Sequence, residues 1–264
     1  MSFFSAEHIN AGYGKQSIVK DVSFTVEEGC LLGLLGANGS GKTTLLKAVC
    51  GILPHEGRCL LDGSALETMT ARQIAGCCSY IPQRSGISID ISALDVVLMG
   101  FNPRLGLLEH PGSAMRESAM RALAQVGLAG KEEMNYLHLS EGQKQLCILA
   151  RTLVSGSSFL LLDEPESALD FRFRCRMLEL LRRWLAEGKR GALVTLHDPT
   201  LAPNYCDKLL LLDRGTLVGT IDPRSDSLDE MERMMSTVYG PVSLHRCQSR
   251  KGRRQLVMLK EDEG

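Results

Sequence analysis

A glycine-rich loop near the N-terminus sets the strongest limit on the fold and on the ligand. Its sequence is Gly36-Ala37-Asn38-Gly39-Ser40-Gly41-Lys42-Thr43-Thr44. The apolar run 31–35 precedes this loop, and residues 45–50, which read as a helix, follow it. Strand, glycine loop and helix in that order form the context of a phosphate-binding P-loop. The sequence therefore predicts a site for a nucleoside triphosphate.

The residue types in the loop suit phosphate chemistry. The glycines allow successive backbone N–H groups to turn inward around the β- and γ-phosphates, and the helix N-terminus adds partial positive charge. Lys42 would place a full charge on the β/γ oxygens, and the Thr43 hydroxyl would bind Mg²⁺. We therefore expect residues 36–44 to bind the nucleotide together with Mg²⁺.

Length and charge narrow the class of protein. The 264 residues suffice for one α/β domain with a small subdomain or for two modest domains. The net charge of -1 gives no sign of a nucleic-acid partner or an anionic-membrane surface. No run of about 18 apolar residues is present, and residues 1–7 lack the pattern of a signal peptide. We expect a cytoplasmic chain with no membrane span of its own.

The cysteines number nine, an odd count, and no CxxC pair occurs among them. Most of them fall inside apolar stretches, where a free cysteine behaves as a small core residue. This pattern favours reduced, structural cysteines over a metal site.

Hydrophobic periodicity divides the chain into strands and helices. The predicted strands are 3–9, 22–26, 31–35, 58–61, 78–81, 159–162, 192–195, 209–213 and 216–221, with a turn at 11–14 and two further candidates at 242–246 and 255–259. The predicted helices are 43–50, 93–99, 115–126, 141–153, 171–187 and 228–236. Strands that alternate with helices imply a doubly wound, mainly parallel sheet in an α/β fold. The helical stretch at about 84–155 reads as a subdomain inserted between two core strands.

Two adjacent carboxylates, Asp163 and Glu164, end the apolar run 159–162. Ligands bind at the carboxyl ends of strands in open α/β sheets. Beside a P-loop, Asp163 suits Mg²⁺ and Glu164 suits a general base for an attacking water. The alternative is a pair of acidic residues that simply ends a strand.

The segment Leu139-Ser140-Glu141-Gly142-Gln143 precedes a predicted helix. Ser140 fits the N-cap position and Gln143 the N3 position, so the segment has the pattern of a capping box. It can therefore be a well-capped helix and nothing more. The functional alternative is a second helix N-terminus that offers a hydroxyl and backbone N–H groups to a phosphate.

Seven motifs occur in the order typical of the ATP-binding subunits of ABC transporters, a family that the chain resembles from about residue 3 to 222. They are Tyr13, the P-loop at 36–44, Gln83, the signature at 139–143, Asp163-Glu164, Ser167-Ala168-Leu169-Asp170 and His197. Residues 97–108 also resemble the importers of iron–siderophore, haem and cobalamin complexes. The resemblance implies a P-loop NTPase with a mainly parallel core sheet, an antiparallel β-subdomain and an inserted helical subdomain at residues 1–240, followed by a short extension at 241–264.

The resemblance implies how a nucleotide would be held. Tyr13 would stack on adenine, and Lys42 and the loop amides would hold the phosphates. Thr43 would bind Mg²⁺, and Gln83 would contact Mg²⁺ or the attacking water and relay occupancy of the site to a membrane partner.

It also implies roles in hydrolysis and in dimer formation. Glu164 would be the general base and His197 would contact the γ-phosphate. The remaining matched residues would serve the dimer: Asp170 at its seam, and Ser140, Gly142 and Gln143 over the γ-phosphate held by the opposite subunit.

The whole chain is thus expected to be the ATP-hydrolysing subunit of an importer for iron–siderophore or related metal chelates. It would act as a homodimer on a membrane permease at the cytoplasmic face of the membrane, with a substrate-binding protein as an indirect partner. Two alternatives stay open, a soluble ABC ATPase without a transport role, such as an iron–sulfur assembly factor, and the ATPase of an exporter. A P-loop switch or kinase would have no reason to carry the signature and His197.

Two residues depart from the family pattern. Glu141 occupies the third signature position in place of glycine, where its charge would repel phosphate if it pointed inward, and we expect it to face away. Glu166 replaces the small residue or threonine usual after the Asp-Glu-Pro motif, which puts the contacts at the dimer seam in doubt.

Overall fold

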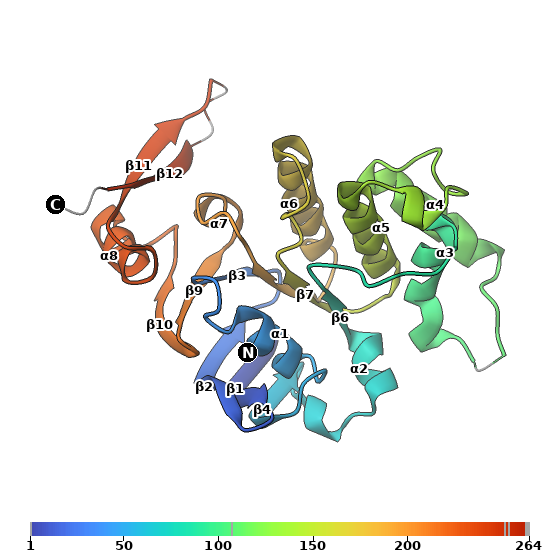
Figure 1. The fold of residues 1–264 in the computed structure, drawn as a ribbon, viewed down its shortest axis with the longest axis horizontal. Helices are drawn as coiled ribbons and strands as arrows, with labels where there is room; N and C mark the ends of the chain where they lie inside the picture. The colour runs from blue at the N-terminus through green and yellow to red at the C-terminus, as the bar shows by residue number, and fades with distance from the viewer. Residues whose placement is uncertain (1, 107, 251, 253, 262–264) are drawn as a thin grey trace.

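A six-stranded sheet, ordered β10-β9-β3-β8-β7-β6, forms the centre of the fold in the computed structural model, which describes residues 2–106, 108–250, 252 and 254–261 (Figure 1). Its strands are β3 (Leu31–Leu35), β6 (Cys78–Ile81), β7 (Phe159–Asp163), β8 (Gly191–Thr195), β9 (Lys208–Asp213) and β10 (Thr216–Ile221). All neighbours pair in parallel except β9 and β10. Every residue of β3, β7 and β8 is buried, as expected for the apolar strands of a sheet covered on both faces.

A second, antiparallel sheet has the order β2-β1-β4-β5. It consists of β1 (Phe4–Tyr13), β2 (Gln16–Val26), β4 (His55–Leu61) and β5 (Ser64–Ala65). The Phe4 ring stacks on Phe159 of the central sheet, with 4.3 Å between ring centroids. Helix α1 (Lys42–Val49) adds its buried leucines to the same hydrophobic core. The α/β class, with a mainly parallel sheet and a separate antiparallel one, is thereby confirmed.

The turn predicted at residues 11–14 is wrong. Strand β1 continues through Tyr13 and β2 begins at Gln16, so the turn lies at Gly14 and Lys15. Gly12 sits inside the hairpin, where an added Cβ would lie 1.9 Å from the Gln16 carbonyl oxygen. Gly12 therefore permits two backbones to approach closely inside the hairpin. The prediction had interpreted this glycine as a turn residue.

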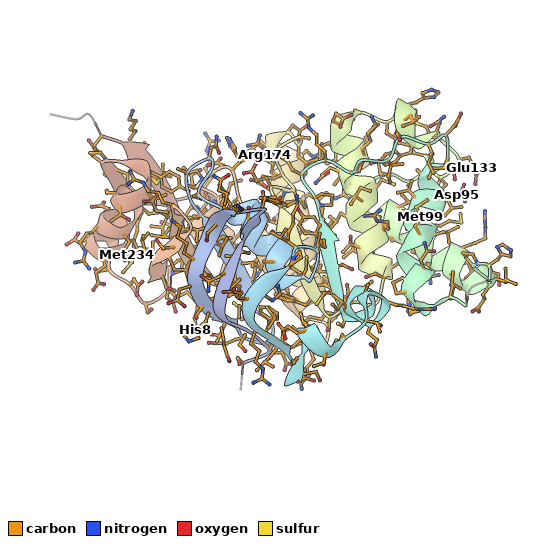
Figure 2. All side chains as sticks on the ribbon, turned by 60° about the horizontal axis from the view of Figure 1, so that its bottom comes forward. His8, Asp95, Met99, Glu133, Arg174 and Met234 are labelled. Atoms are coloured by element: carbon orange, nitrogen blue, oxygen red, sulfur yellow. The ribbon has the colours of Figure 1, made fainter. Side chains whose placement is uncertain are left out.

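Between β6 and β7 the chain forms a group of helices at one end of the molecule (Figure 1). It contains α3 (Ala93–Leu98), η2 (Met99–Arg104), α4 (Ser113–Val126), η3 (Tyr136–His138) and α5 (Glu141–Val154). Met99 in this group and Met234 in α8 (Leu228–Tyr239) lie at opposite ends of the long axis (Figure 2). The hairpin of β11 (Val242–Gln248) and β12 (Arg254–Lys260) follows α8.

The remaining elements connect or cover the sheets. They are η1 (Leu66–Thr68), α2 (Ala71–Cys77), α6 (Phe171–Leu185) and α7 (Ala202–Tyr205). The sequence analysis did not predict β5, η1, α2 or α7. Within the described residues, no helix combines the length and the hydrophobicity that crossing a membrane requires.

Candidate active site

The P-loop connects β3 to α1, and its backbone depends on glycine. Gly39 and Gly41 have φ values of 80° and 106°, in the left-handed region that other residues avoid. Lys42, the first residue of α1, is buried, and its Nζ donates to the carbonyl oxygens of Gly36 at 2.8 Å and Ala37 at 3.2 Å. The loop thus folds around the lysine ammonium.

A carboxylate faces this ammonium across the site. Lys42 Nζ lies 4.0 Å from Glu164 Oε1, just after the end of β7. Burial lowers the pKa of Lys42, and the charges of Glu164 and Asp163 oppose that shift. A triphosphate that entered here would bring negative charge next to a lysine already withdrawn from water, where electrostatic attraction is strong.

Asp163 is the centre of a network of hydroxyl groups. The hydroxyls of Thr43 and Thr195 donate to its Oδ1, each at 3.1 Å, and the Tyr80 hydroxyl donates to its Oδ2 at 3.0 Å. The first contact joins the P-loop helix to β7, as the sequence predicts for a shared ion site. A threonine hydroxyl beside a carboxylate supplies the oxygen ligands that Mg²⁺ prefers.

Glu164 is held in an unusual backbone conformation. Its φ is 45°, and its N–H donates to Thr195 Oγ1 at 2.8 Å. A non-glycine residue in this region costs about 1–3 kcal/mol, and such strain is concentrated at functional sites. Its Oε2 accepts a hydrogen bond from Gln83 Nε2 at 2.9 Å. The structure therefore brings together Gln83, Glu164 and Lys42, three residues that the sequence analysis assigned to the nucleotide site.

Sequence reasoning missed Tyr80 and Thr195. Tyr80 lies on β6 beside Leu161 of β7, and Thr195 ends β8 directly opposite Asp163. Each is a polar residue at or near the carboxyl end of a buried strand next to β7. That position was the available signal, because ligand-binding groups gather at this edge of a parallel sheet.

Glu166 is fully buried and links the loop after β7 to the segment that follows β8. Its Oε1 accepts the backbone N–H of His197 at 2.6 Å, while its Oε2 has no hydrogen-bond partner among the described residues. The ring of His197 stands in an exposed position. Burial raises the pKa of Glu166, the charge of Glu164 raises it further, and the bond from His197 lowers it.

This raised pKa predicts a pH-dependent stability. The folded chain holds the Glu166 proton to higher pH than the unfolded chain, so unfolding free energy falls as pH rises from the usual carboxyl value of 4.5 through the folded pKa. Glu166→Gln keeps the acceptor for His197 and removes the charge. At neutral pH we expect it to be more stable than the parent by on the order of 1 kcal/mol, because only the parent then buries a charge.

Urea unfolding across the acidic to neutral range measures this difference. It should shrink as the pH falls, because the parent side chain becomes protonated. Glu141→Gln is the matched control: its carboxylate is 74% exposed and pairs with Lys144 Nζ at 2.7 Å, so its effect should be small throughout. An equal gain for Glu166→Gln at every pH would contradict the raised pKa.

The signature segment forms the start of α5. The Gln143 N–H donates to Ser140 Oγ at 3.3 Å and the Ser140 N–H donates to Gln143 Oε1 at 3.1 Å, which confirms the capping box. An added Cβ at Gly142 would lie 3.0 Å from the Ala168 carbonyl oxygen, so the helix start packs on the loop 167–170. Asp170, at the end of that loop, caps α6 by accepting the Phe173 N–H at 3.0 Å.

The signature and the P-loop do not meet within one copy. In the described part of the chain, no hydrogen bond or ion pair joins residues 139–143 to residues 36–44. The predicted site residues thus form two groups, one around Lys42 and Asp163 and one at the N-terminus of α5.

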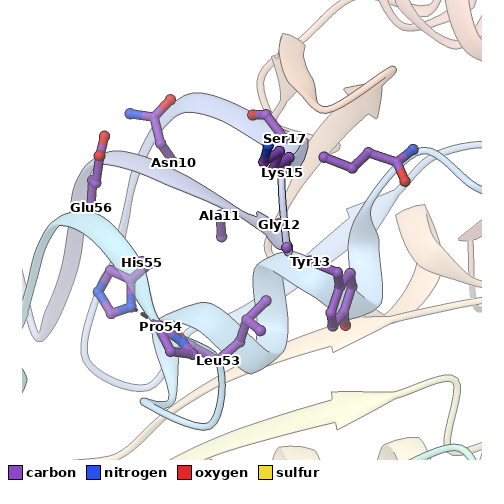
Figure 3. Close-up of a pocket in the computed structure, with 12 residues that line it drawn as sticks. Asn10, Ala11, Gly12, Tyr13, Lys15, Ser17, Leu53, Pro54, His55 and Glu56 are labelled. Carbon is purple, nitrogen blue, oxygen red and sulfur yellow. Dashed lines mark hydrogen bonds between the residues drawn. The ribbon is translucent and has the colours of Figure 1, made fainter.

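Tyr13 lies apart from both groups, at the end of β1. It is 50% exposed and lines a cleft of about 710 Å³ together with residues 10–17 and 53–56 (Figure 3). An exposed aromatic ring on the wall of a cleft can stack on a flat base. The sequence analysis identified Tyr13 but gave no role to Leu53 or His55, which line the same cleft.

Comparison with known proteins places this arrangement in a family. The ABC transporter family profile matches residues 19–167. The hemin import ATP-binding protein HmuV of Bordetella pertussis is 37% identical over 246 residues, covering 89% of this chain and 91% of that protein. The chain belongs to the ABC transporter ATP-binding family. It is therefore an ATP-hydrolysing subunit of the transport-coupled type, as the order of its motifs predicts.

Other members of the family are similar over most of their length. The manganese transport system ATP-binding protein MntB of Bacillus subtilis is 35% identical over 78% of this chain and 81% of its own. Among solved structures, a chain from a transporter assigned to the metal-chelate type, in an inward-facing conformation, has a TM-score of 0.82 and 25% identity over 99% of both chains.

Proposed function

We propose that this ABC ATPase energises the import of haem or a related metal chelate. It would act as a homodimer on a membrane permease at the cytoplasmic face, with a substrate-binding protein as an indirect partner. The observation that supports the import class is the 37% identity to a hemin import ATP-binding protein over nearly the whole of both chains. The stretch 97–108, of which residue 107 lies outside the described residues, adds the resemblance to chelate importers. Iron–siderophore complexes belong to the same chemical class of cargo.

In this proposal the residues around Lys42 and Asp163, together with Tyr13 and His197, bind and hydrolyse the nucleotide. Lys42 and the P-loop amides bind the phosphates, Tyr13 stacks on adenine, and Glu164 takes the proton of the attacking water. His197 contacts the γ-phosphate. The fixed backbone of Glu164 and its contacts with Thr195 and Gln83 support its role, because a base must be positioned before it can act.

Mg²⁺ fits the oxygen atoms at this site. Thr43 and Asp163 would hold it, with the Gln83 amide oxygen as a further ligand. When bound, the ion would neutralise charge on the phosphates.

The separation of the signature from the P-loop supports a dimer. Ser140, Gly142 and Gln143 would act on the nucleotide bound to a second copy, through the hydroxyl and the N–H groups at the start of α5. The exposed Glu141 carboxylate pairs with Lys144, which would keep its charge off the phosphate. Asp170 would lie at the seam, beside the packed contact between Gly142 and Ala168.

Purification of the tagged chain from solubilised native membranes tests this proposal. We expect a polytopic permease to be recovered with it and identified by mass spectrometry. After reconstitution with the cognate binding protein, haem loading outside should raise ATP hydrolysis more than ferric siderophore or Mn²⁺ does. Stimulation by cargo inside the vesicles would identify an exporter, and recovery only from the soluble fraction, without a permease, would identify a non-transport ATPase.

A further inference from the structure

Three side chains of different chemistry meet at the corner between β4 and η1. His55 and Cys59 lie four residues apart on β4, and Glu67 reaches them from η1. One nitrogen, one sulfur and one carboxylate oxygen, each from a different side chain, lie within 4.8 Å of one another. None of these residues belongs to the P-loop, the Asp163 network or the signature.

The spacing of these atoms suits a tetrahedral metal ion. His55 Nε2 lies 3.3 Å from Glu67 Oε1 and 3.8 Å from Cys59 Sγ. Zinc bonds of about 2.0 Å to nitrogen and oxygen and about 2.3 Å to sulfur place tetrahedral ligand atoms roughly 3.3–3.6 Å apart. The two distances from His55 Nε2 are therefore close to those that one bound ion requires, and all three ligand atoms lie within 4.8 Å of one another.

The orientation of the imidazole points to the same conclusion. His55 Nδ1 lies 3.3 Å from the Leu53 carbonyl oxygen, a contact drawn as a dashed line in Figure 3. A carbonyl only accepts, so Nδ1 is the nitrogen that donates to it, and Nε2 is the nitrogen that faces the Glu67 carboxylate. Without a metal, a second proton on the ring would make this contact an ion pair, and a divalent cation bound to Nε2 and the carboxylate would take the place of that proton. A histidine fixed by a backbone carbonyl is the usual form of a metal ligand.

The exposure of the three side chains and a hydrogen bond to Glu67 also suit a metal site. The Cys59 side chain is fully buried and that of His55 is 9% exposed, whereas Glu67 is 33% exposed. The Cys59 N–H donates to Glu67 Oε1 at 2.6 Å and orients the carboxylate. The cluster is therefore shielded on the protein side and open to solvent beside Glu67, where an ion could enter and a water could be the fourth ligand.

We propose that His55, Cys59 and Glu67 bind a zinc-type divalent cation at the edge of the Tyr13 cleft. A sulfur and an imidazole ligand select Zn²⁺ over the hard ions Mg²⁺ and Ca²⁺, so this site is distinct from that of the nucleotide's Mg²⁺. The sequence analysis interpreted the cysteines as core residues, and that interpretation fits the other buried ones. At Cys59, folding places a histidine and a glutamate against the thiol.

Cobalt titration of the reduced, nucleotide-free chain tests the site directly. Co²⁺ should produce a thiolate-to-cobalt charge-transfer band that saturates at one ion per chain and disappears when Zn²⁺ displaces it. The P-loop contains no sulfur, so a metal bound there gives no such band. In parallel, Zn²⁺ should raise the melting temperature, because it binds the folded state.

Variants assign the band to these residues. Cys59→Ser should remove it, and His55→Gln and Glu67→Gln should each weaken Zn²⁺ binding by at least about tenfold, the scale of losing one supporting contact. Glu67 is partly exposed, so its variant remains informative if the buried Cys59→Ser chain fails to fold. His8→Gln, which removes an exposed histidine paired with Asp21 on the same sheet, and Cys247→Ser, which removes an exposed thiol, are matched controls and should bind normally.

Two results would overturn the proposal. The first is the absence of a charge-transfer band in the parent chain. The second is a band that persists in His55→Gln and Glu67→Gln at unchanged affinity but is lost in Cys77→Ser, which would place the metal at the neighbouring Cys77 and Cys78 thiols, whose sulfur atoms lie 3.9 Å apart.

Discussion

Glu164→Gln should lose nearly all ATP turnover and still bind ATP. A positioned general base contributes about 10²–10⁴-fold to rate, and the amide cannot take a proton. Glutamine has the same shape as glutamate, so the bond from the backbone N–H to Thr195 and the packing beside Lys42 should persist. ATP binding also avoids the charge of a carboxylate 4.0 Å from the lysine, so affinity should stay equal or rise.

Phosphate release measures turnover, and equilibrium binding of a labelled ATP measures affinity. Size-exclusion chromatography with ATP and Mg²⁺ should show the variant as a stable dimer, because ATP that is not hydrolysed would keep contacting the P-loop of one copy and the signature of the other. Glu117→Gln is the control, since Glu117 pairs with Arg121 on α4, outside the Lys42 network and the signature. Turnover by Glu164→Gln at the parent rate would show that another group takes the proton.

Two inactive variants should restore each other's ATP hydrolysis when mixed. Lys42→Ala removes the P-loop charge, and Ser140→Arg blocks the helix start at the signature, so each should be inactive as a homodimer. In a mixed dimer the Ser140→Arg copy supplies an intact P-loop and the Lys42→Ala copy supplies an intact signature. One of the two sites should then be complete, because in the proposed dimer each site uses groups from both copies.

The measurement is ATP hydrolysis by each variant alone and by mixtures at constant total protein. Activity should rise to a maximum near equal proportions and fall on either side. The double variant, which carries both changes in one chain, is the control, and mixing it with either single variant should restore nothing. Failure of the two single variants to complement under conditions where mixed dimers form would argue for a site built within one copy.

The parts of the fold that the sequence predicted well are those with a strong local pattern. Strands β3 and β6 were predicted to the residue, because the first is an apolar run that ends at a glycine and the second is a short segment that ends at a proline. Helix α2, which was missed, has no buried residue, so it carries no apolar periodicity to detect. It is held instead by the capping box of Thr70 and Gln73, a signal too weak to stand alone.

The candidate site divides in the same way. Lys42, Asp163 and Glu164 stand in contiguous motifs and could be named from the sequence. Thr195 had only the weaker signal of a polar residue at the end of an apolar strand, because its contact with Asp163 comes from the register of two parallel strands more than thirty residues apart. The His55, Cys59 and Glu67 cluster likewise depends on how the corner between β4 and η1 is folded. Residues that function through tertiary contacts leave no local pattern.

The hydrogen bond from Gln83 to Glu164 joins the loop after β6 to the proposed general base. While the Gln83 amide occupies one oxygen of the carboxylate, an attacking water would have to compete for the base, so the timing of hydrolysis would depend on this loop. Gln83 lies near the start of the segment that leads from the core sheet to the helical group. A displacement of those helices would therefore change the position of the Gln83 side chain relative to Glu164. ATP would then be hydrolysed only after the loop had moved Gln83 away from Glu164, and bound ATP would stay intact until that movement.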